Sequence, residues 1–194
     1  MVVGLGNPGA EYADTRHNAG FLLADALANR WQLAFRRAPQ ALAASGTVAG
    51  QPLLLIKPHT YMNNSGTALL PLLAHPEFDP ARDLLILVDD GALPLETFRL
   101  RARGSSGGHN GLESVESALA SRVYSRLRIG IGPIPQDVTD LADWVLAPFT
   151  EQEGRILTGL LPQMADAVEC WVTDGIETAM NRFNKKPRAD DENG

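Results

Sequence analysis

Four short apolar runs, separated by helical patterns, constrain the fold of this chain most. They are VVGL (2–5), LLLIKP (53–58), DLLILVDD (83–90) and RLRIGIG (126–132). Runs of this length suit buried strands. Helical periodicity occupies three segments between them, at about 18–31, 64–74 and 110–121. Strands that alternate with helices favour parallel pairing. We therefore predict an α/β fold: a single-domain three-layer sandwich with a mixed, largely parallel central sheet flanked by helices.

Two further elements are predicted nearer the C-terminus. ETFRLRAR (96–103) alternates apolar residues with arginines, which indicates a half-exposed, antiparallel strand with the arginines on its open side. Thr150 and Glu153 form a capping box for a long helix, which Pro162 is expected to kink. The inner stripe of this helix is expected to contain Ile156, Leu157, Leu160, Leu161, Met164, Val168 and Trp171.

The composition suits one intracellular domain. At 194 residues the chain is long enough for one core, and we expect a domain at 1–184 and a disordered polar tail at 185–194. The one cysteine, Cys170, lies in an apolar helical pattern and is expected to be a buried structural thiol. We find no signal peptide and no apolar run of membrane-spanning length, so we expect a soluble, cytoplasmic protein with no membrane contact.

Charge is distributed unevenly along the chain. The formal net charge of −6 argues mildly against nucleic acid as a partner. However, residues 95–130 hold six arginines against three acids, whereas 137–177 hold nine acids and one basic residue. A cationic region in an acidic protein can bind a phosphate-bearing ligand, or it can be a solvated arginine face. Charge alone does not decide between a phosphate-binding region and a solvated face.

VVGLGNPG (2–9) matches the dinucleotide-binding fingerprint G-x-G-x-x-G. That fingerprint needs a helix directly after its third glycine, to hold the pyrophosphate. Here Pro8-Gly9 is a turn dipeptide, and the first helical pattern begins later, with Asn18 as a plausible N-cap. Asp25 lies inside that helix instead of ending a second strand. A dinucleotide-binding oxidoreductase is therefore a weak alternative, and we expect no cofactor.

The residues that can do chemistry follow the predicted strands. Ligands bind beyond the carboxyl ends of parallel strands, and we expect the following side chains to converge there: Asn7, Asn63, Asn64, Asn110, His17 and one aspartate of the pair Asp89 and Asp90. Singly, each asparagine is more simply a turn or capping residue. Their placement at one edge of the sheet favours a site.

Other chemistries fit less well. The four histidines (His17, His59, His75 and His109) show no zinc-ligand spacing, so we expect no metal. Ser65, Ser105 and Ser106 lack the G-x-S-x-G turn of a serine nucleophile. RGSSGGHNG (103–111) lacks the P-loop ending and suits a mobile lid with glycine hinges. A histidine, a carboxylate and several amides are the groups of a general-base hydrolase, in which the amides donate to the developing oxyanion.

Four ordered motifs resemble the bacterial-type peptidyl-tRNA hydrolase family over about residues 2–184. They are VGLGNPGAEYADTRHNAG, KPHTYMNNSG, GSSGGHNGL and RLRIGIG. The resemblance implies cleavage of the ester between a peptide, or an N-blocked amino acid, and the terminal ribose of tRNA, which recycles tRNA from peptides lost during translation. It also implies a monomeric α/β protein, peptidyl-tRNA as partner, no metal and a cytoplasmic location. A non-catalytic RNA-binding module is the third class to test.

The resemblance also implies roles for single residues. His17 matches the catalytic proton acceptor, Asp89 the aspartate that holds it, and Asn7 the asparagine that distinguishes blocked from free aminoacyl-tRNA. Positions that contact the peptide and the 3′ end match Tyr12, Tyr61, Asn63 and Asn110. The basic pair that clamps a tRNA phosphate matches Arg101 and Arg128.

Three departures from the family pattern matter. VDDGALP replaces most of an acidic-leucine-acidic run, which leaves Asp89 and Asp90 as alternatives, and counting back from Pro94 favours Asp89. Arginine at position 101 is often lysine in the family. The chain also begins inside the first strand. We predict that the rate rises with pH through one imidazole-like limb, and the sequence does not separate water from the ribose hydroxyl as the group that His17 activates.

Overall fold

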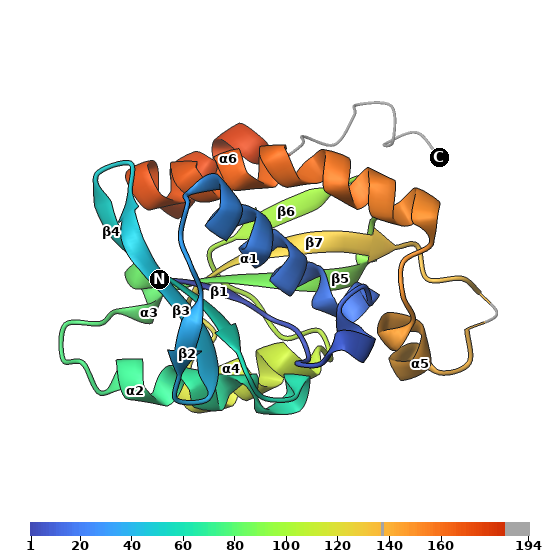
Figure 1. Cartoon of the computed structure of the whole chain (residues 1–194), viewed down its shortest axis with the longest axis horizontal. Helices are drawn as coiled ribbons and strands as arrows, with labels where there is room; N and C mark the ends of the chain where they lie inside the picture. The colour runs from blue at the N-terminus through green and yellow to red at the C-terminus, as the bar shows by residue number, and fades with distance from the viewer. Residues whose placement is uncertain (137, 185–194) are drawn as a thin grey trace.

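A seven-stranded sheet forms the middle layer of the molecule (Figure 1). The computed structural model describes residues 1–136 and 138–184, and the predicted tail at 185–194 lies outside them. The strands are β1 (Val2–Gly4), β2 (Arg36–Ala38), β3 (Ala41–Val48), β4 (Gln51–Pro58), β5 (Leu85–Pro94), β6 (Phe98–Arg101) and β7 (Ser125–Gly132). Their order across the sheet is β2-β3-β4-β1-β5-β7-β6.

The four central strands are parallel, as predicted. Val3 of β1 lies opposite Ile56 of β4 and Ile86 of β5, and β7 continues the parallel pairing on the far side of β5. The flanking strands β2, β3 and β6 pair in antiparallel fashion. The carboxyl ends of β4, β1, β5 and β7 therefore meet at one edge of the sheet, where ligands of such folds bind.

Helices cover both faces of the sheet, which confirms the three-layer prediction (Figure 1). On one face lie α1 (Ala19–Arg30) and α6 (Glu151–Phe183). On the other lie the 3₁₀ helix η3 (Met62–Leu69), α2 (Leu70–Leu73) and α4 (Asn110–Leu119). The shorter elements are η1 (Ala10–Tyr12), η2 (Arg16–Asn18), α3 (Pro80–Asp83) and α5 (Leu141–Leu146). Each face buries its own apolar cluster.

The glycines of the fingerprint pack helix α1 against the sheet. A Cβ on Gly4 would lie 2.4 Å from the carbonyl oxygen of Gly20, and a Cβ on Gly20 would lie 2.4 Å from that of Leu87. After Gly9, whose φ is 121°, the chain forms η1 and η2 before α1 begins. No helix N-terminus therefore follows the third glycine directly. Close packing of Gly4 and Gly6 against α1 and the positive φ of Gly9 account for these glycines without a dinucleotide.

The predictions for the C-terminal half are largely confirmed. Phe98 and Leu100 of β6 are buried while its arginines are exposed, and Thr150 and Glu153 form the capping box of α6. Leu157, Met164, Val168 and Trp171 are buried, and Ile156, Leu160 and Leu161 are half-buried. Pro162 lies inside α6, where the expected kink stays a prediction, and Gly175 has non-helical angles (φ 80°, ψ 176°) that the sequence did not indicate.

Three differences have local physical causes. The hairpin of β2 and β3 was not predicted, because ALAASGTV consists mostly of small residues with weak strand signals, and pairing with β4 forms the strand. The predicted helix at 64–74 is the 3₁₀ helix η3 followed by α2. Asn18 stands at the N-cap position of α1, but its side chain makes no capping bond and instead contacts the backbone of Asn7.

Two expectations from composition can also be compared with the structure. Cys170 is buried and unpaired with another cysteine, and burial raises the pKa of its thiol, as suits a structural residue. Within residues 1–136 and 138–184, no helix is both long and apolar enough to cross a membrane.

Candidate active site

A cleft of about 540 Å³ lies at the edge where the parallel strands end. Its polar wall contains Asn7, His17, Asn63, Asp89, His109 and Asn110. Asn7 and His17 follow β1, Asn63 follows β4, Asp89 lies in β5, and His109 and Asn110 stand at the start of α4, so the predicted convergence is observed. The apolar wall belongs to α5 and to the segment after β7.

His17 lies in η2 and is almost fully buried, with 7% of its surface exposed. Its Nδ1 atom is 3.0 and 3.1 Å from the two carboxylate oxygens of Asp89. A carboxylate only accepts hydrogen bonds, so Nδ1 carries the proton. Among the contacts of the described residues, Nε2 has no hydrogen-bond partner. Its lone pair is therefore available at the wall of the cleft.

Asp89, at a buried position of β5, accepts hydrogen bonds from two histidines. Besides His17, its Oδ1 lies 2.9 Å from Nε2 of His109. Burial opposes ionisation of this carboxyl group, but the contacts with His109 and His17 outweigh it and lower the pKa of Asp89 below its ordinary value. The neighbouring Asp90 contacts Arg128 instead, with Oδ2 and Nε 2.9 Å apart. Of the two aspartates, the structure thus places Asp89 against His17.

His109 was not predicted as a site residue. It occupies the N-cap position of α4, where its Nδ1 accepts hydrogen bonds from the backbone N–H groups of Gly111 (3.1 Å) and Leu112 (3.3 Å). Its proton must therefore reside on Nε2, which donates to Asp89. The one signal in the sequence is a histidine directly before a predicted helix, where serine, threonine, asparagine or aspartate is usual.

The grouping of His17, Asp89 and His109 has the residue types of a metal site, with candidate ligand atoms within 4.8 Å of one another. The proton arrangement fits hydrogen bonds better. A histidine that binds metal through Nε2 carries its proton on Nδ1 and donates it to an acceptor. Nδ1 of His109 faces two N–H donors and has no room for that proton. The chemistry of the three groups therefore favours a hydrogen-bonded triad.

Asn7 is held so that its amide group faces the cleft. Its Oδ1 accepts a hydrogen bond from the backbone N–H of Met62 at 2.7 Å. Its backbone N–H and carbonyl bond to the side chain of Asn18, at 2.7 and 3.0 Å. Because the oxygen of the amide is used by Met62, the NH₂ group is the part of Asn7 that can donate to a substrate.

The other predicted contact residues divide into two groups. Asn63 and Asn110 are exposed and line the cleft, and Tyr61 stands at its rim with 63% of its surface exposed. Tyr12 and Asn64 are not among the residues that line it. The expectation that Asn64 joins the site is therefore wrong. Asn64 lies in η3 with an exposed side chain, and its carbonyl accepts the hydroxyl of Thr67.

The arginines of β6 and β7 share one face of the sheet. Arg101 lies opposite Arg126, so Arg101 and Arg128 are diagonal neighbours across the two strands. Arg101 is exposed and Arg128 is half-buried beside Asp90. Arg126 is buried, however, and stacks on Tyr124 at 4.2 Å. Arg101 and part of Arg128 are therefore accessible at the surface, whereas Arg126 is not.

The glycine-rich loop before α4 lies against these arginines. Nη1 of Arg126 donates to the carbonyl of Ser105 at 3.0 Å, and His109 ties the other end of the loop to Asp89. Gly107 and Gly108 have positive φ angles of 64° and 82°, which favour glycine. The predicted mobility of this loop stays a prediction.

The apolar wall is a feature that the sequence did not predict. Leu141 and Leu146 of α5 are 54% and 37% exposed, and Ile134 is 37% exposed. Val145 completes the wall. Exposed apolar groups that line a cleft opposite polar groups are typical of a binding site for a ligand with apolar parts.

Comparison with known proteins identifies the family and the fold that this chain shares. A family model described as "Peptidyl-tRNA hydrolase" matches residues 1–191. A peptidyl-tRNA hydrolase of Chloroflexus aurantiacus is 49% identical over 186 residues, which cover 95% of this chain and 98% of the relative. That of Gemmatimonas aurantiaca is 44% identical over 188 residues, covering 95% and 99%. The crystal structure of peptidyl-tRNA hydrolase from Acinetobacter baumannii superposes with a TM-score of 0.88 at 33% identity, covering 96% of this chain and 95% of that one.

Proposed function

This chain belongs to the peptidyl-tRNA hydrolase family, and we propose that His17 is the base of its reaction. The protein hydrolyses the ester between a peptide, or an N-blocked amino acid, and the 3′-terminal ribose of tRNA, and so recycles tRNA released prematurely in translation. One observation carries the assignment of the base. His17 is bonded to Asp89 through Nδ1 and leaves Nε2 unpartnered at the cleft, among the contacts described.

The reaction begins at Nε2 of His17. This nitrogen accepts a proton from water while the water oxygen attacks the ester carbonyl, and the Nδ1–H group stays bonded to Asp89. The carboxylate stabilises the imidazolium that forms. The bond between the carbonyl carbon and the ribose oxygen then breaks, and the imidazolium gives its proton to that oxygen. Free peptide and tRNA leave, and His17 is neutral again.

Asn7 contributes a hydrogen-bond donor for two tasks. Asn7 lines the cleft, and among the hydrogen bonds of the described residues its NH₂ group has no acceptor, so this group is suited to donate to a substrate oxygen as negative charge develops there. The same donor matches the carbonyl of an N-blocked amino acid but not a free ammonium group, which has no lone pair to offer. This accounts for the discrimination that we assign to Asn7. We expect Asn63 and Asn110 to add donors nearby.

The apolar wall of the cleft and the arginine face of β6 and β7 suit two different parts of the substrate. The apolar side chains of α5 suit the peptide, and the arginine face suits the tRNA backbone. Arg101 and Arg128, as diagonal neighbours, are placed to approach one phosphate, and the rigid fork of arginine matches phosphate oxygens. We also propose that Tyr61 and Tyr12 contact the peptide and the 3′ end of the substrate. We further propose that the protein acts as a cytoplasmic monomer, since one chain supplies every group used here.

Release of an N-acetylated amino acid from tRNA tests the activity. The same tRNA carrying the amino acid with a free amine is the matched control, and we expect it to be spared. A dinucleotide-binding oxidoreductase or a non-catalytic RNA-binding module would release nothing, and no observation favours either class. Equal cleavage of both substrates would contradict the role of Asn7.

A substrate whose terminal ribose lacks the neighbouring hydroxyl tests the nucleophile. If His17 activates water, this substrate still turns over. Loss of turnover with unchanged binding would instead assign the abstracted proton to that hydroxyl.

A further inference from the structure

Arg16, the residue directly before His17, is buried although it carries a permanent charge. Only 8% of its side chain is exposed. Its Nη2 donates to both carboxylate oxygens of Glu153, at 3.0 and 2.8 Å. Its Nη1 donates to the backbone carbonyls of Ala147 and Pro148, at 3.2 and 3.1 Å. One guanidinium group therefore connects η2 to the residues that follow α5 and to the start of α6.

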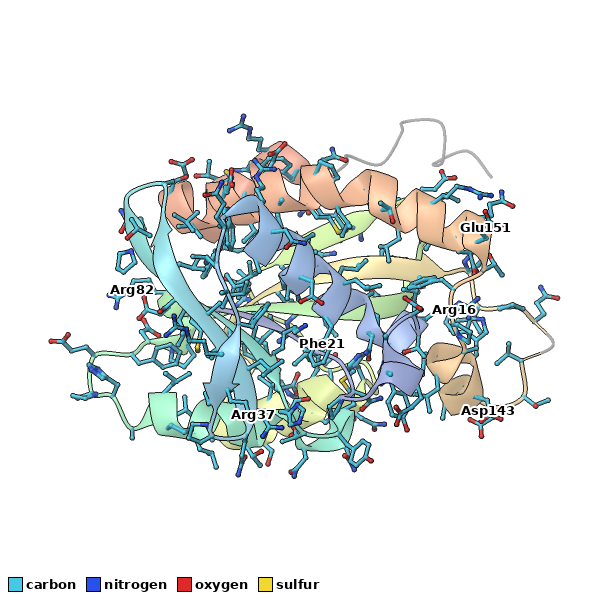
Figure 2. All side chains as sticks on the ribbon, in the orientation of Figure 1. Arg16, Phe21, Arg37, Arg82, Asp143 and Glu151 are labelled. Carbon is cyan, nitrogen blue, oxygen red and sulfur yellow. The ribbon has the colours of Figure 1, made fainter. Side chains whose placement is uncertain are left out.

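Aromatic rings complete the surroundings of this guanidinium. Its carbon lies 5.1 Å from the ring centre of Trp144 in α5 and 5.7 Å from that of Phe149. Figure 2 shows Arg16 between α5, marked by Asp143, and the start of α6, marked by Glu151. Contacts of this kind are stronger when water is excluded, as it is around this side chain.

Among the contacts of residues 1–136 and 138–184, helix α5 has little other anchorage. None of its six residues is buried, and its apolar contacts with the core come from the half-buried Trp144 and Val145. The backbone adds two hydrogen bonds to the same segment: from the N–H of Arg16 to the carbonyl of Ala147 (3.2 Å) and from that of Phe149 to the carbonyl of Asp14 (2.9 Å). The apolar wall of the cleft is thus attached mainly to the segment that carries His17.

We propose that Arg16 is a positioning residue that sets the distance between His17 and the apolar wall, and so governs binding of the peptide part of the substrate. This inference rests on the proposed function. A buried ion pair is often no more stabilising than apolar residues of the same size, whereas the five fixed donors of arginine define one arrangement of their acceptors. Lysine keeps the charge but carries all its donors on one nitrogen, so it cannot place separate nitrogens at Glu153 and at the two carbonyls as Arg16 does.

The substitution Arg16→Lys tests this with two substrates on the same tRNA. One carries N-acetylglycine, and the other carries an N-acetylated peptide of several leucines. We expect kcat/KM for the leucine peptide to fall about tenfold relative to N-acetylglycine, mostly through KM, because the wall must be ordered on binding. kcat for N-acetylglycine should change little. An equal fall for both substrates would indicate a merely structural role and overturn the proposal.

Arg30→Lys is the matched control. Arg30 also joins two helices, since its Nη2 donates to Asp166 and Glu169 of α6 at 2.7 and 2.9 Å, but it does not line the cleft. The ratio between the substrates should be unchanged in this variant. If Arg16→Lys fails to fold, Glu153→Gln replaces it, because glutamine preserves the capping box of α6. We then expect a smaller fall in the ratio of kcat/KM for the leucine peptide to kcat/KM for N-acetylglycine. An unchanged ratio overturns the proposal.

A readout without catalysis separates this inference from the proposed function. The chain has three tryptophans, Trp31, Trp144 and Trp171. With fluorinated tryptophan, we expect Arg16→Lys to shift or broaden the ¹⁹F resonance of Trp144 and to leave the other two in place. If the wild-type protein cleaves neither substrate, the proposed function fails while this test still applies. An unmoved Trp144 resonance overturns the role of Arg16 even in an active enzyme.

Discussion

Two histidines share one carboxylate in this protein, and each stands at the head of a helix. His17 precedes α1 and His109 caps α4, with their ring centres 4.8 Å apart. His17 reaches Asp89 through Nδ1, whereas His109 reaches it through Nε2. The two rings therefore carry their protons on opposite nitrogens.

This difference determines which histidine can act as a base. Nδ1 of His109 is occupied by two backbone N–H groups of α4, so protonation there would break both hydrogen bonds and uncap the helix. His17 can accept a proton at Nε2 without loss of any contact. Both rings are equally close to Asp89, so distance does not decide the matter. The cap on α4 decides it, because it leaves only one of the two rings with a lone pair that can accept a proton.

The largest effect is expected for His17→Ala. Removal of the base should lower the single-turnover rate by about 10³- to 10⁴-fold, toward the upper end of general-base contributions. Binding of tRNA should persist, because the phosphate contacts lie elsewhere. Rates and binding constants are measured with N-acetyl-aminoacyl-tRNA, and His75→Ala, at an exposed position, is the control. A greater loss of rate in His109→Ala than in His17→Ala would instead indicate that His109 is the base.

The next largest effect is expected for Asp89→Asn, which should lower the single-turnover rate by about 10²-fold. Both histidines donate to Asp89, but an asparagine in its place can accept at its oxygen and must donate from its nitrogen. His109 cannot change its tautomer while it caps α4, so the conflict falls on His17. Its proton then moves to Nε2, and the base is lost. Catalysis should weaken more than tRNA affinity, and an equal loss in both would remove Asp89 from the support of the base.

The parts of this site that follow strand ends could be predicted from the sequence. Apolar runs locate the parallel strands, and their carboxyl ends bring Asn7 and Asp89 to one edge. His17 follows from the same argument, because it lies in the connection after β1. The role of His109 could not be predicted, since it depends on which ring nitrogen faces the start of α4. That is a matter of ring orientation, for which periodicity carries no signal.

Long-range contacts between polar groups could not be predicted from the sequence either. Arg16 and Glu153 are 137 positions apart, and no pattern of spacing joins them. Helix α5 is short and has no buried residue, so it lacks the periodic stripe that marked α6. Pairing and packing with distant segments determine these features, and local propensity does not.

His109→Asn should have a smaller effect, of about tenfold on the rate. Asparagine is a good N-cap and can accept the N–H groups of α4, so the fold should persist, but the hydrogen bond to the charged Asp89 is lost. His75→Asn makes the same change at an exposed site as a control. Ring ¹⁵N shifts of the wild type should show an unprotonated Nδ1 in His109 and an unprotonated Nε2 in His17. The same tautomer in both rings would refute the comparison.

The smallest effect concerns stability in acid. Because the pKa of Asp89 is lowered in the folded protein, folding favours its ionised form. Its contribution to the free energy of unfolding is present above the ordinary carboxyl pKa of about 3.9 and is lost as the pH falls through the folded value. Urea denaturation at a series of pH values should therefore show that wild type loses stability relative to Asp89→Asn on acidification below about pH 4.

This last measurement can also rank the two histidines. Contacts with both His109 and His17 lower the pKa of Asp89, so His109→Asn and His17→Asn should each remove part of the acid-dependent difference. A larger loss in His109→Asn would mean that the base and the main support of the carboxylate are different residues. An equal effect of the two substitutions would mean that the carboxylate depends on both rings alike. In that case only the unpartnered nitrogen of His17 would distinguish the two histidines.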